Sequence, residues 1–220
     1  MNDNIINTII CGDCLPIMRD MPDDSVDLVL TDPPYGIGED GGRFRGRKGD
    51  GIRVLPKGNW DNEPPPKEVF DEIQRVSKNQ VIWGGNYFTD KLPVSRGWLY
   101  WDKLMGGDFS DGELAWTSFD TVLKKFTLCN KMGGRVHPAQ KPVCLGEWIL
   151  ERFTKPGDSI LDTHSGSGSF CVAAKRLGRN YIGIDIIEEY CQIARDRLAA
   201  EEAGLTVKEM KKGQKGLFER

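Results

Sequence analysis

Short apolar runs alternate with longer amphipathic segments along most of this chain. Seven runs have the length and composition of strands, at residues 5–11, 25–31, 80–83, 97–101, within 120–129, at 159–162 and at 180–185. Five segments carry apolar residues at helical spacing, at 15–21, 67–77, 142–153, 167–177 and 187–203. Strands separated by helices are typical of a doubly wound α/β fold, so we predict a mostly parallel, seven-stranded sheet.

Length and composition limit how the chain is organised. At 220 residues with 39% apolar and 29% charged residues, it is long enough for one well-buried domain. We assign this domain to residues 1–204, and residues 205–220 to a Lys-rich tail. No apolar run approaches the roughly 20 residues of a membrane span, and the polar start lacks a signal-peptide pattern. The sequence therefore predicts a cytoplasmic protein without membrane contact.

One strand runs into an unusual loop. Its apolar residues continue directly into Asp32, Pro33, Pro34 and Tyr35. The prolines end the strand, because they have no N–H to donate to a sheet and restrict the residue before them. A plain strand followed by a proline turn is the simpler interpretation of such a loop. With the added aromatic, it predicts a carboxylate and a ring at the carboxyl end of a buried strand, where open α/β sheets place their sites.

A glycine-rich loop forms the second candidate pole of a site. Asp162 ends a strand, and Ser165, Gly166 and Gly168 follow before the next helix. Glycines let the backbone approach a ligand, and a helix start offers free N–H groups to an anion. At the tip of the next strand stands Asp185, placed as an acid that accepts the hydroxyls of a ribose. Together these features predict a cofactor that contains a nucleoside, while the missing Lys-Ser/Thr argues against a P-loop.

The cysteines do not predict a metal site. Cys11 and Cys14 form one C-x-x-C pair, but the other four cysteines are scattered singly. A zinc site would need a second pair at similar spacing, and the pair leaves a strand rather than opening a long helix as in thioredoxin-like proteins. We expect free thiols and no metal.

Four motifs in order resemble one enzyme family. They are Asp32 to Tyr35, His137 to Pro142, Asp162 to Gly168, and Gly183 to Asp185. This chain resembles the β-class S-adenosylmethionine-dependent DNA amino-methyltransferases, particularly small phage or prophage members. The resemblance covers most of residues 5–200. It implies the Rossmann-like class I methyltransferase fold with circularly permuted motif order, in which the strand ending at Asp32 lies beside the strand ending at Asp162.

The resemblance also assigns roles to cofactor-binding residues. Asp13 resembles the acid on the adenine amino group of S-adenosylmethionine, and Asp185 the acid on its ribose. Gly166 and Gly168, in the loop that also holds Asp162 and Ser165, would line the methionine moiety, and Lys141 lies in the segment that closes over it. Simpler roles remain open: Asp13 as a helix cap, Lys141 as a solvated lysine, His137 as a structural histidine. Thr163-His164 departs from the Pro-Phe of many members, and His164 is interpreted as a loop residue.

The implied reaction is methylation of an exocyclic amine. Asp32 and the Pro33 carbonyl would accept hydrogen bonds from the amine, and Tyr35 would stack on a base flipped out of the duplex. An Asp before the two prolines favours adenine N6, with cytosine N4 or an adenine in RNA as alternatives. A DNA-binding relative without activity would be expected to have a broken motif, and a nucleotide-dependent oxidoreductase would carry G-x-G-x-x-G. Neither feature is present.

Three segments are candidate contacts with partners. The glycine-rich loop at about 39–58 has a strongly basic stretch and predicts contacts with DNA phosphates through Arg43, Arg45, Arg47, Lys48 and Arg53. A solvated loop is the alternative. A recognition insert would fall at about 103–136, and because it is short, either specificity is relaxed or a second subunit contributes, as a homodimer. Gln214 to Phe218 resembles the pattern that docks bacterial proteins on the sliding clamp, with a frayed terminus as the alternative. The resemblance places such an enzyme in a bacterial or phage-infected cell and associates it with restriction-modification.

Overall fold

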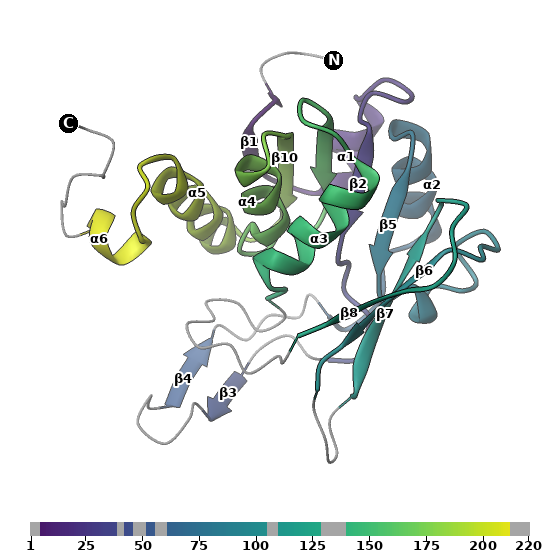
Figure 1. Ribbon diagram of the computed structural model, residues 1–220, viewed down its shortest axis with the longest axis horizontal. Helices are drawn as coiled ribbons and strands as arrows, with labels where there is room; N and C mark the ends of the chain where they lie inside the picture. Colours follow the sequence, from purple (N-terminus) through teal and green to yellow (C-terminus); the bar gives the residue numbers. More distant parts are fainter. Residues whose placement is uncertain are drawn as a thin grey trace.

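Eight strands form one mixed sheet. The computed structural model describes residues 5–38, 61–104, 110–128 and 140–211, and the backbone of 42–45 and 52–55. The strands are β1 (Thr8–Cys11), β2 (Leu28–Thr31), β5 (Gln80–Trp83), β6 (Trp98–Asp102), β7 (Gly112–Thr117), β8 (Lys124–Thr127), β9 (Ser159–Asp162) and β10 (Asn180–Asp185), in the spatial order β1-β10-β9-β2-β5-β7-β6-β8 (Figure 1). The first five in this order are mutually parallel, whereas β7 is antiparallel to β5 and β6. The α/β class and mostly parallel sheet are confirmed, but the sheet has eight strands rather than seven because β7 was not predicted.

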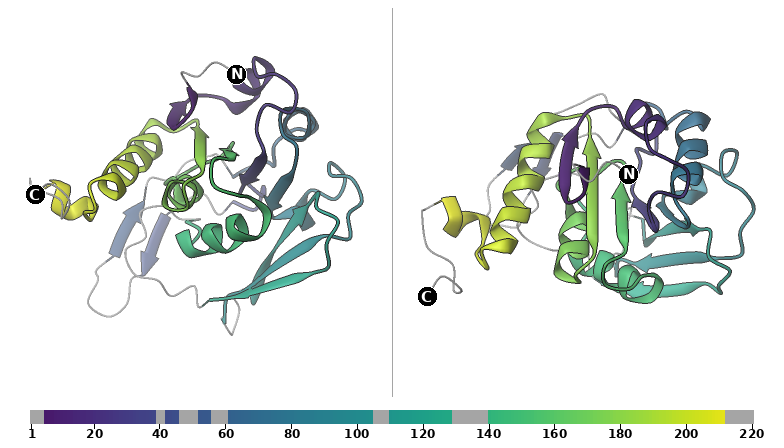
Figure 2. Two further views of the ribbon diagram at one scale, coloured as in Figure 1. Left: turned by 45° about the horizontal axis from the view of Figure 1, so that its top comes forward. Right: turned by 90° about the horizontal axis from the view of Figure 1, so that it is seen from above.

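Helices cover both faces of this sheet. They are α1 (Cys14–Arg19), α2 (Lys67–Val76), α3 (Val143–Phe153), α4 (Ser169–Arg176), α5 (Glu188–Glu202) and α6 (Val207–Lys211), with a 3-10 turn, η2, at Gly85–Tyr87. Helices α1 and α2 lie on one side, and α3, α4 and α5 lie on the other (Figure 2). The five predicted helices agree with α1 to α5 within a few residues. The segment expected to be only a tail contains α6, which contacts α5.

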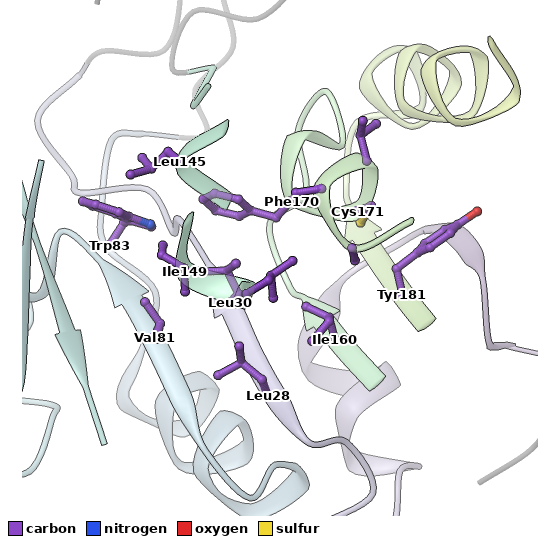
Figure 3. Packing of buried hydrophobic residues seen from close by; sticks show 14 of the residues in the cluster. Leu28, Leu30, Val81, Trp83, Leu145, Ile149, Ile160, Phe170, Cys171 and Tyr181 are labelled. Atoms are coloured by element: carbon purple, nitrogen blue, oxygen red, sulfur yellow. The ribbon is translucent and has the colours of Figure 1, made fainter. Parts of the chain in front are cut away.

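Alternation along β2 divides the core between the two faces. Leu28 and Leu30 pack in the cluster that includes α3 and α4, whereas Val29 packs in the cluster that includes α1 and α2. Figure 3 shows Leu28 and Leu30 among side chains of the first cluster, near Ile149. These three side chains are fully buried, which explains why β2 is apolar at consecutive positions.

The register of β2 and β9 brings two distant parts of the chain together. Leu28 is the partner of Ile160 and Val29 of Leu161 in a parallel pair. At the ends of these strands, Thr31 Oγ1 and Thr163 Oγ1 share a hydrogen bond of 3.0 Å. The expected adjacency of the two strands is therefore correct, and their loops leave the same edge of the sheet.

The basic segment contains a small hairpin. Strands β3 (Gly42–Arg45) and β4 (Ile52–Leu55) pair antiparallel in a two-stranded sheet of their own (Figure 1). The sequence predicted a loop without strands here. Arg43, Arg45 and Arg53 lie in the hairpin strands, whereas Arg47 and Lys48 lie outside the described residues.

Two further predicted segments also fall outside the described part of the chain, namely His137 and the Gln214 to Phe218 motif. Among the described residues, no helix has both the length and the apolar composition needed to cross a membrane.

Candidate active site

Four acidic residues gather at one edge of the sheet. Asp13 and Asp32 follow the carboxyl ends of β1 and β2, while Asp162 and Asp185 end β9 and β10. These four strands are parallel neighbours, so their carboxyl ends meet. The structure thus brings the predicted catalytic loop and the predicted cofactor loop to a common edge.

Asp32 is held by a hydroxyl and an ammonium group. Tyr35 Oη donates to Asp32 Oδ1 at 2.6 Å, and Lys141 Nζ donates to Asp32 Oδ2. The Asp32 side chain is only 13% exposed. Burial raises the pKa of this carboxyl, and the Lys141 charge and the Tyr35 hydroxyl oppose that rise. Both oxygens are therefore oriented by neighbours from separate parts of the chain.

The Tyr35 ring is packed by other aromatic residues and by a glycine. It stacks on Tyr87, with ring centroids 4.8 Å apart and an interplanar angle of 14°, and it meets the edge of Phe88. Gly84, with φ of +70°, has its backbone against the same ring, where a Cβ would lie 2.1 Å from Tyr35 Cε1. The segment after β5 thus supplies both a stacking partner and the space that Tyr35 needs.

A chain of alternating charges continues from Asp32 into the sheet. Lys141 Nζ lies 2.9 Å from Glu113 Oε2, and Lys103 Nζ pairs with Glu113 Oε1. Although burial alone would raise it, the two ammonium groups lower the pKa of Glu113 to about 2. The resemblance placed Lys141 in the segment that closes over the methionine moiety, and in this structure its ammonium binds the Asp32 carboxylate.

Glu113 carried no signal in the sequence. It belongs to β7, which was not predicted, and no motif surrounds it. Lys103 directly follows β6, and no individual role was predicted for it from the sequence. Trp83, at the end of β5, has its ring centroid 5.8 Å from Lys141 Nζ.

The glycine loop is fixed by Asp185. Gly166 N–H donates to Asp185 Oδ2 at 2.7 Å, and Ile187 N–H donates to Oδ1 at 2.9 Å. Burial raises the pKa of Asp185, and these two backbone bonds oppose the rise. The acid at the tip of β10 thus joins the glycine loop to the start of α5.

The two glycines of this loop have different surroundings. Gly166 adopts φ of +50°, in the left-handed region. At Gly168, φ is +74° and a Cβ would lie 2.8 Å from Ala194 Cβ of α5. The need for glycine at position 168 is therefore explained by close packing of the α4 start on α5, and its predicted contact with methionine stays a prediction.

Comparison with known proteins shows the family of this chain. A family model described as DNA methylase matches residues 101–196. The putative methylase YubD of Escherichia coli K12 is 31% identical over 226 residues, covering 89% of this chain and 91% of YubD. The chain belongs to the DNA methylase family. A second relative of the methylase is the type II methyltransferase M2.DpnII of Streptococcus pneumoniae, which is 36% identical over 155 residues, with 69% of this chain and 53% of the relative covered.

Solved structures share the fold of the methylase. The putative DNA modification methylase TTHA0409 of Thermus thermophilus, solved with S-adenosyl-L-methionine, superposes with a TM-score of 0.62 at 18% identity, over 90% of this chain and 96% of that one. The cytosine-N4-specific PvuII DNA methyltransferase gives 0.59 at 17% identity, over 85% and 84%. The class I methyltransferase fold expected from the motifs is confirmed.

Asp13 of the methylase caps a helix. Its Oδ1 accepts the N–H of Leu15 at 2.9 Å at the start of α1. The capping role considered from the sequence is therefore present. The Asp13 side chain is also exposed beside the site, so it remains accessible to a cofactor, and the contact with adenine stays a prediction.

Burial shifts two titrations in the glycine loop of the methylase. It raises the pKa of Asp162 to about 8 and lowers the pKa of His164 to about 4. His164 Nδ1 lies 2.9 Å from Thr163 Oγ1, so this histidine belongs to the loop structure, as expected.

The five described cysteines of the methylase are free thiols. Cys11, Cys191 and Glu188 place their donor atoms within 4.8 Å of one another, a grouping that C-x-x-C spacing did not predict. Cys14 of the C-x-x-C pair is not in this group.

Proposed function

We propose that this methylase transfers a methyl group to the exocyclic N6 amine of an adenine that is flipped out of double-stranded DNA. The observation that carries the proposal is the adjacency of β2 and β9, which places the Asp32 loop beside the glycine loop. Direct transfer between two bound groups requires such a shared edge, because positioning supplies much of the rate enhancement.

The cofactor of this reaction is S-adenosylmethionine, whose sulfonium supplies the electrophilic methyl group. Asp185 fits the ribose, Asp13 the adenine, and the 162–168 loop the methionine moiety. Ser165 fits this role because its Oγ is buried without a hydrogen-bond partner among the described residues. A buried hydroxyl without a partner is unfavourable, so a polar ligand group beside it would be stabilised.

The residues of the Asp32 loop orient the amine. Asp32 and the Pro33 carbonyl accept its hydrogens, which directs the nitrogen lone pair at the methyl group. When the new N–C bond forms and the S–C bond breaks, the amine nitrogen would gain positive charge. It would then lose a proton to the Asp32 carboxylate or to solvent. An ionised Asp32 stabilises that charge. Tyr35 and the half-exposed Tyr87 offer aromatic faces on which the flipped base stacks.

Cytosine N4 is the second candidate target. Cytosine also presents an exocyclic amine, and the PvuII enzyme that shares this fold is cytosine-N4-specific. We favour adenine because an Asp precedes the two prolines. An adenine in RNA is a further alternative, and the test below distinguishes all three.

Contacts with DNA are assigned to the basic hairpin segment and to the 103–136 region, whose strands β7 and β8 belong to the main sheet. Arg43, Arg45, Arg47, Lys48 and Arg53 would bind phosphates, which makes affinity fall with rising salt. A homodimer would extend this short recognition surface. We also propose that this enzyme acts in a bacterial or phage-infected cell and belongs to a restriction-modification system.

Docking on the sliding clamp through Gln214 to Phe218 belongs to the same proposal. A chain truncated after Lys212 should fail to retain purified clamp in a pull-down that the full chain passes. Equal retention would contradict this contact.

The main experiment identifies the methylated base. The full chain is incubated with radiolabelled S-adenosylmethionine and DNA or RNA, and the products are digested to nucleosides and identified by mass. We expect N6-methyl-2′-deoxyadenosine from DNA. Asp32→Ala should abolish methyl transfer, while its binding of the cofactor, measured by calorimetry, persists. Asp90→Ala, at an exposed turn, is the matched control and should keep methyl transfer. Label in N4-methyl-2′-deoxycytidine would identify cytosine as the target base, and label in RNA would identify RNA as the substrate. Methyl transfer by Asp32→Ala would contradict the mechanism.

A further inference from the structure

The Lys141 ammonium is bound to Asp32, the carboxylate that the proposed reaction needs as a hydrogen-bond acceptor. Lys141 donates to Asp32 Oδ2, while Tyr35 Oη donates to Oδ1, so both oxygens already have donors. In the proposed function, the target amine must donate to the same carboxylate. Each oxygen can accept a second hydrogen bond, but the Asp32 side chain is only 13% exposed and both donors already flank it, so the amine competes with Lys141 for access to Asp32.

A displaced Lys141 would need another partner close by. Its side chain is 6% exposed, so its ammonium has little access to water. A buried ammonium without a carboxylate is strongly unfavourable. The rings of Tyr35 and Trp83, with centroids 5.7 and 5.8 Å from Nζ, leave its charge unneutralised.

Glu113 is the second carboxylate within reach. Its Oε2 lies 2.9 Å from Lys141 Nζ in the present arrangement, so the ammonium can leave Asp32 without leaving Glu113. Lys103 binds the other oxygen and fixes the direction of the Glu113 carboxylate. The four groups alternate in charge and sum to zero.

We propose that Glu113 is a positioning residue that retains the Lys141 ammonium when the target amine replaces it at Asp32. This inference rests on the proposed function. Without the Glu113 charge, Lys141 has Asp32 as its one remaining carboxylate partner among the described residues and competes more strongly with the amine. The chemical step should slow, while DNA contacts made by the basic hairpin segment are unchanged.

The pH dependence of the rate gives a signature that a merely structural role would not produce. Asp32 faces Lys141 and Tyr35, and the carboxylates of Glu113 and Asp162 also act on its electrostatic environment. The negative charge of Glu113 raises the pKa of Asp32, so its removal lowers that pKa. The acid limb of the kcat profile should therefore move to lower pH even as the plateau falls.

The test compares the wild-type chain with Glu113→Gln in steady-state methylation of DNA between pH 5 and 9. We expect kcat to fall about 10- to 100-fold, with KM for DNA unchanged and the acid limb at lower pH. Glu72→Gln is the matched control, because Glu72 is also 20% exposed and ion-paired but lies on α2 with Arg75. Glu113→Asp should recover the position of the acid limb and part of kcat.

The outcomes separate the two proposals. A wild-type chain that does not methylate DNA overturns the proposed function. An active wild type with Glu113→Gln at wild-type kcat, or with a reduced kcat and an unmoved acid limb, overturns the role of Glu113. If Glu113→Gln does not fold, Glu113→Ser takes its place: a lower kcat with the acid limb at lower pH supports the role, and a wild-type kcat or an unmoved limb contradicts it.

Discussion

Gly84 lies directly against the ring of Tyr35, where a Cβ would be 2.1 Å from Cε1. Gly84→Ala should therefore displace the Tyr35 ring and reduce methyl transfer about 100-fold, because a shift of about 1 Å at a positioned group has such effects. The backbone at +70° adds strain of about 1–2 kcal/mol. Rates and thermal denaturation measure the two effects.

Gly157→Ala controls for the strain in this comparison. Its φ is +89°, but no heavy atom outside its immediate neighbours lies within 4 Å of the added Cβ. It should lose stability by a similar amount and keep its rate. Equal rates for both variants would contradict a packing role for Gly84.

Tyr35→Phe should remove the hydroxyl at Asp32 and keep the aromatic ring. Because the Tyr35 hydrogen bond lowers the pKa of Asp32, its loss should move the acid limb of kcat to higher pH. A lost hydrogen bond to a charged group predicts a fall in kcat of about tenfold or more. Tyr181→Phe, on β10, should leave the profile in place, and an unmoved acid limb in Tyr35→Phe would refute the assignment.

Asp13 can be tested for its two roles separately. Asp13→Ser retains an N-cap side chain at α1, whereas Asp13→Ala loses it at a cost of about 1 kcal/mol. If the carboxylate contacts the cofactor, both variants should bind S-adenosylmethionine more weakly in calorimetry, although only the alanine variant loses stability. Full cofactor affinity in Asp13→Ser would leave capping as the role of Asp13.

Asp162 should make the ligand-free protein less stable at high pH. Its pKa is about 8 in the folded chain and about 4 when unfolded. The folded state therefore binds more protons between these values, and its free energy of unfolding falls as the pH rises from about 4 to 8. Asp162→Asn should match the wild type near pH 4 and exceed its stability by a few kcal/mol at pH 8.5.

Chemical denaturation at several pH values measures this difference. The comparison of variant with wild type cancels the opposite effect of His164, which destabilises the fold as the pH falls from about 6.5 to 4. A constant difference between the two proteins across this range would contradict the buried titration of Asp162.

The two loops of the site could be predicted from the sequence because each one is marked by a local motif. Asp32 with its prolines and the 162–168 loop each follow an apolar strand, and parallel strands end at a common edge. The side chain of Asp13 also behaved as its position before a helix predicts, since an Asp at such a start caps the free N–H groups.

Glu113 and the placement of Lys141 could not be predicted in the same way. Strand β7 is mixed, with half-buried residues before buried ones, and Glu113 interrupts its apolar pattern. A buried carboxylate in a strand is favourable only with its ammonium partners, and these come from residues 103 and 141. Such a pairing depends on the fold and leaves no periodic pattern in the chain.

The position of β9 and β10 between β1 and β2 has a consequence for synthesis of the chain. Strand β1 pairs with β10, and β2 pairs with β9 on one side, so a nascent chain that ends before residue 159 lacks both partners. Its β1 and one edge of β2 would remain open, and open edges attract other chains. The native partners of β1 and of one edge of β2 therefore lie far along the chain, and contacts of such long range slow folding.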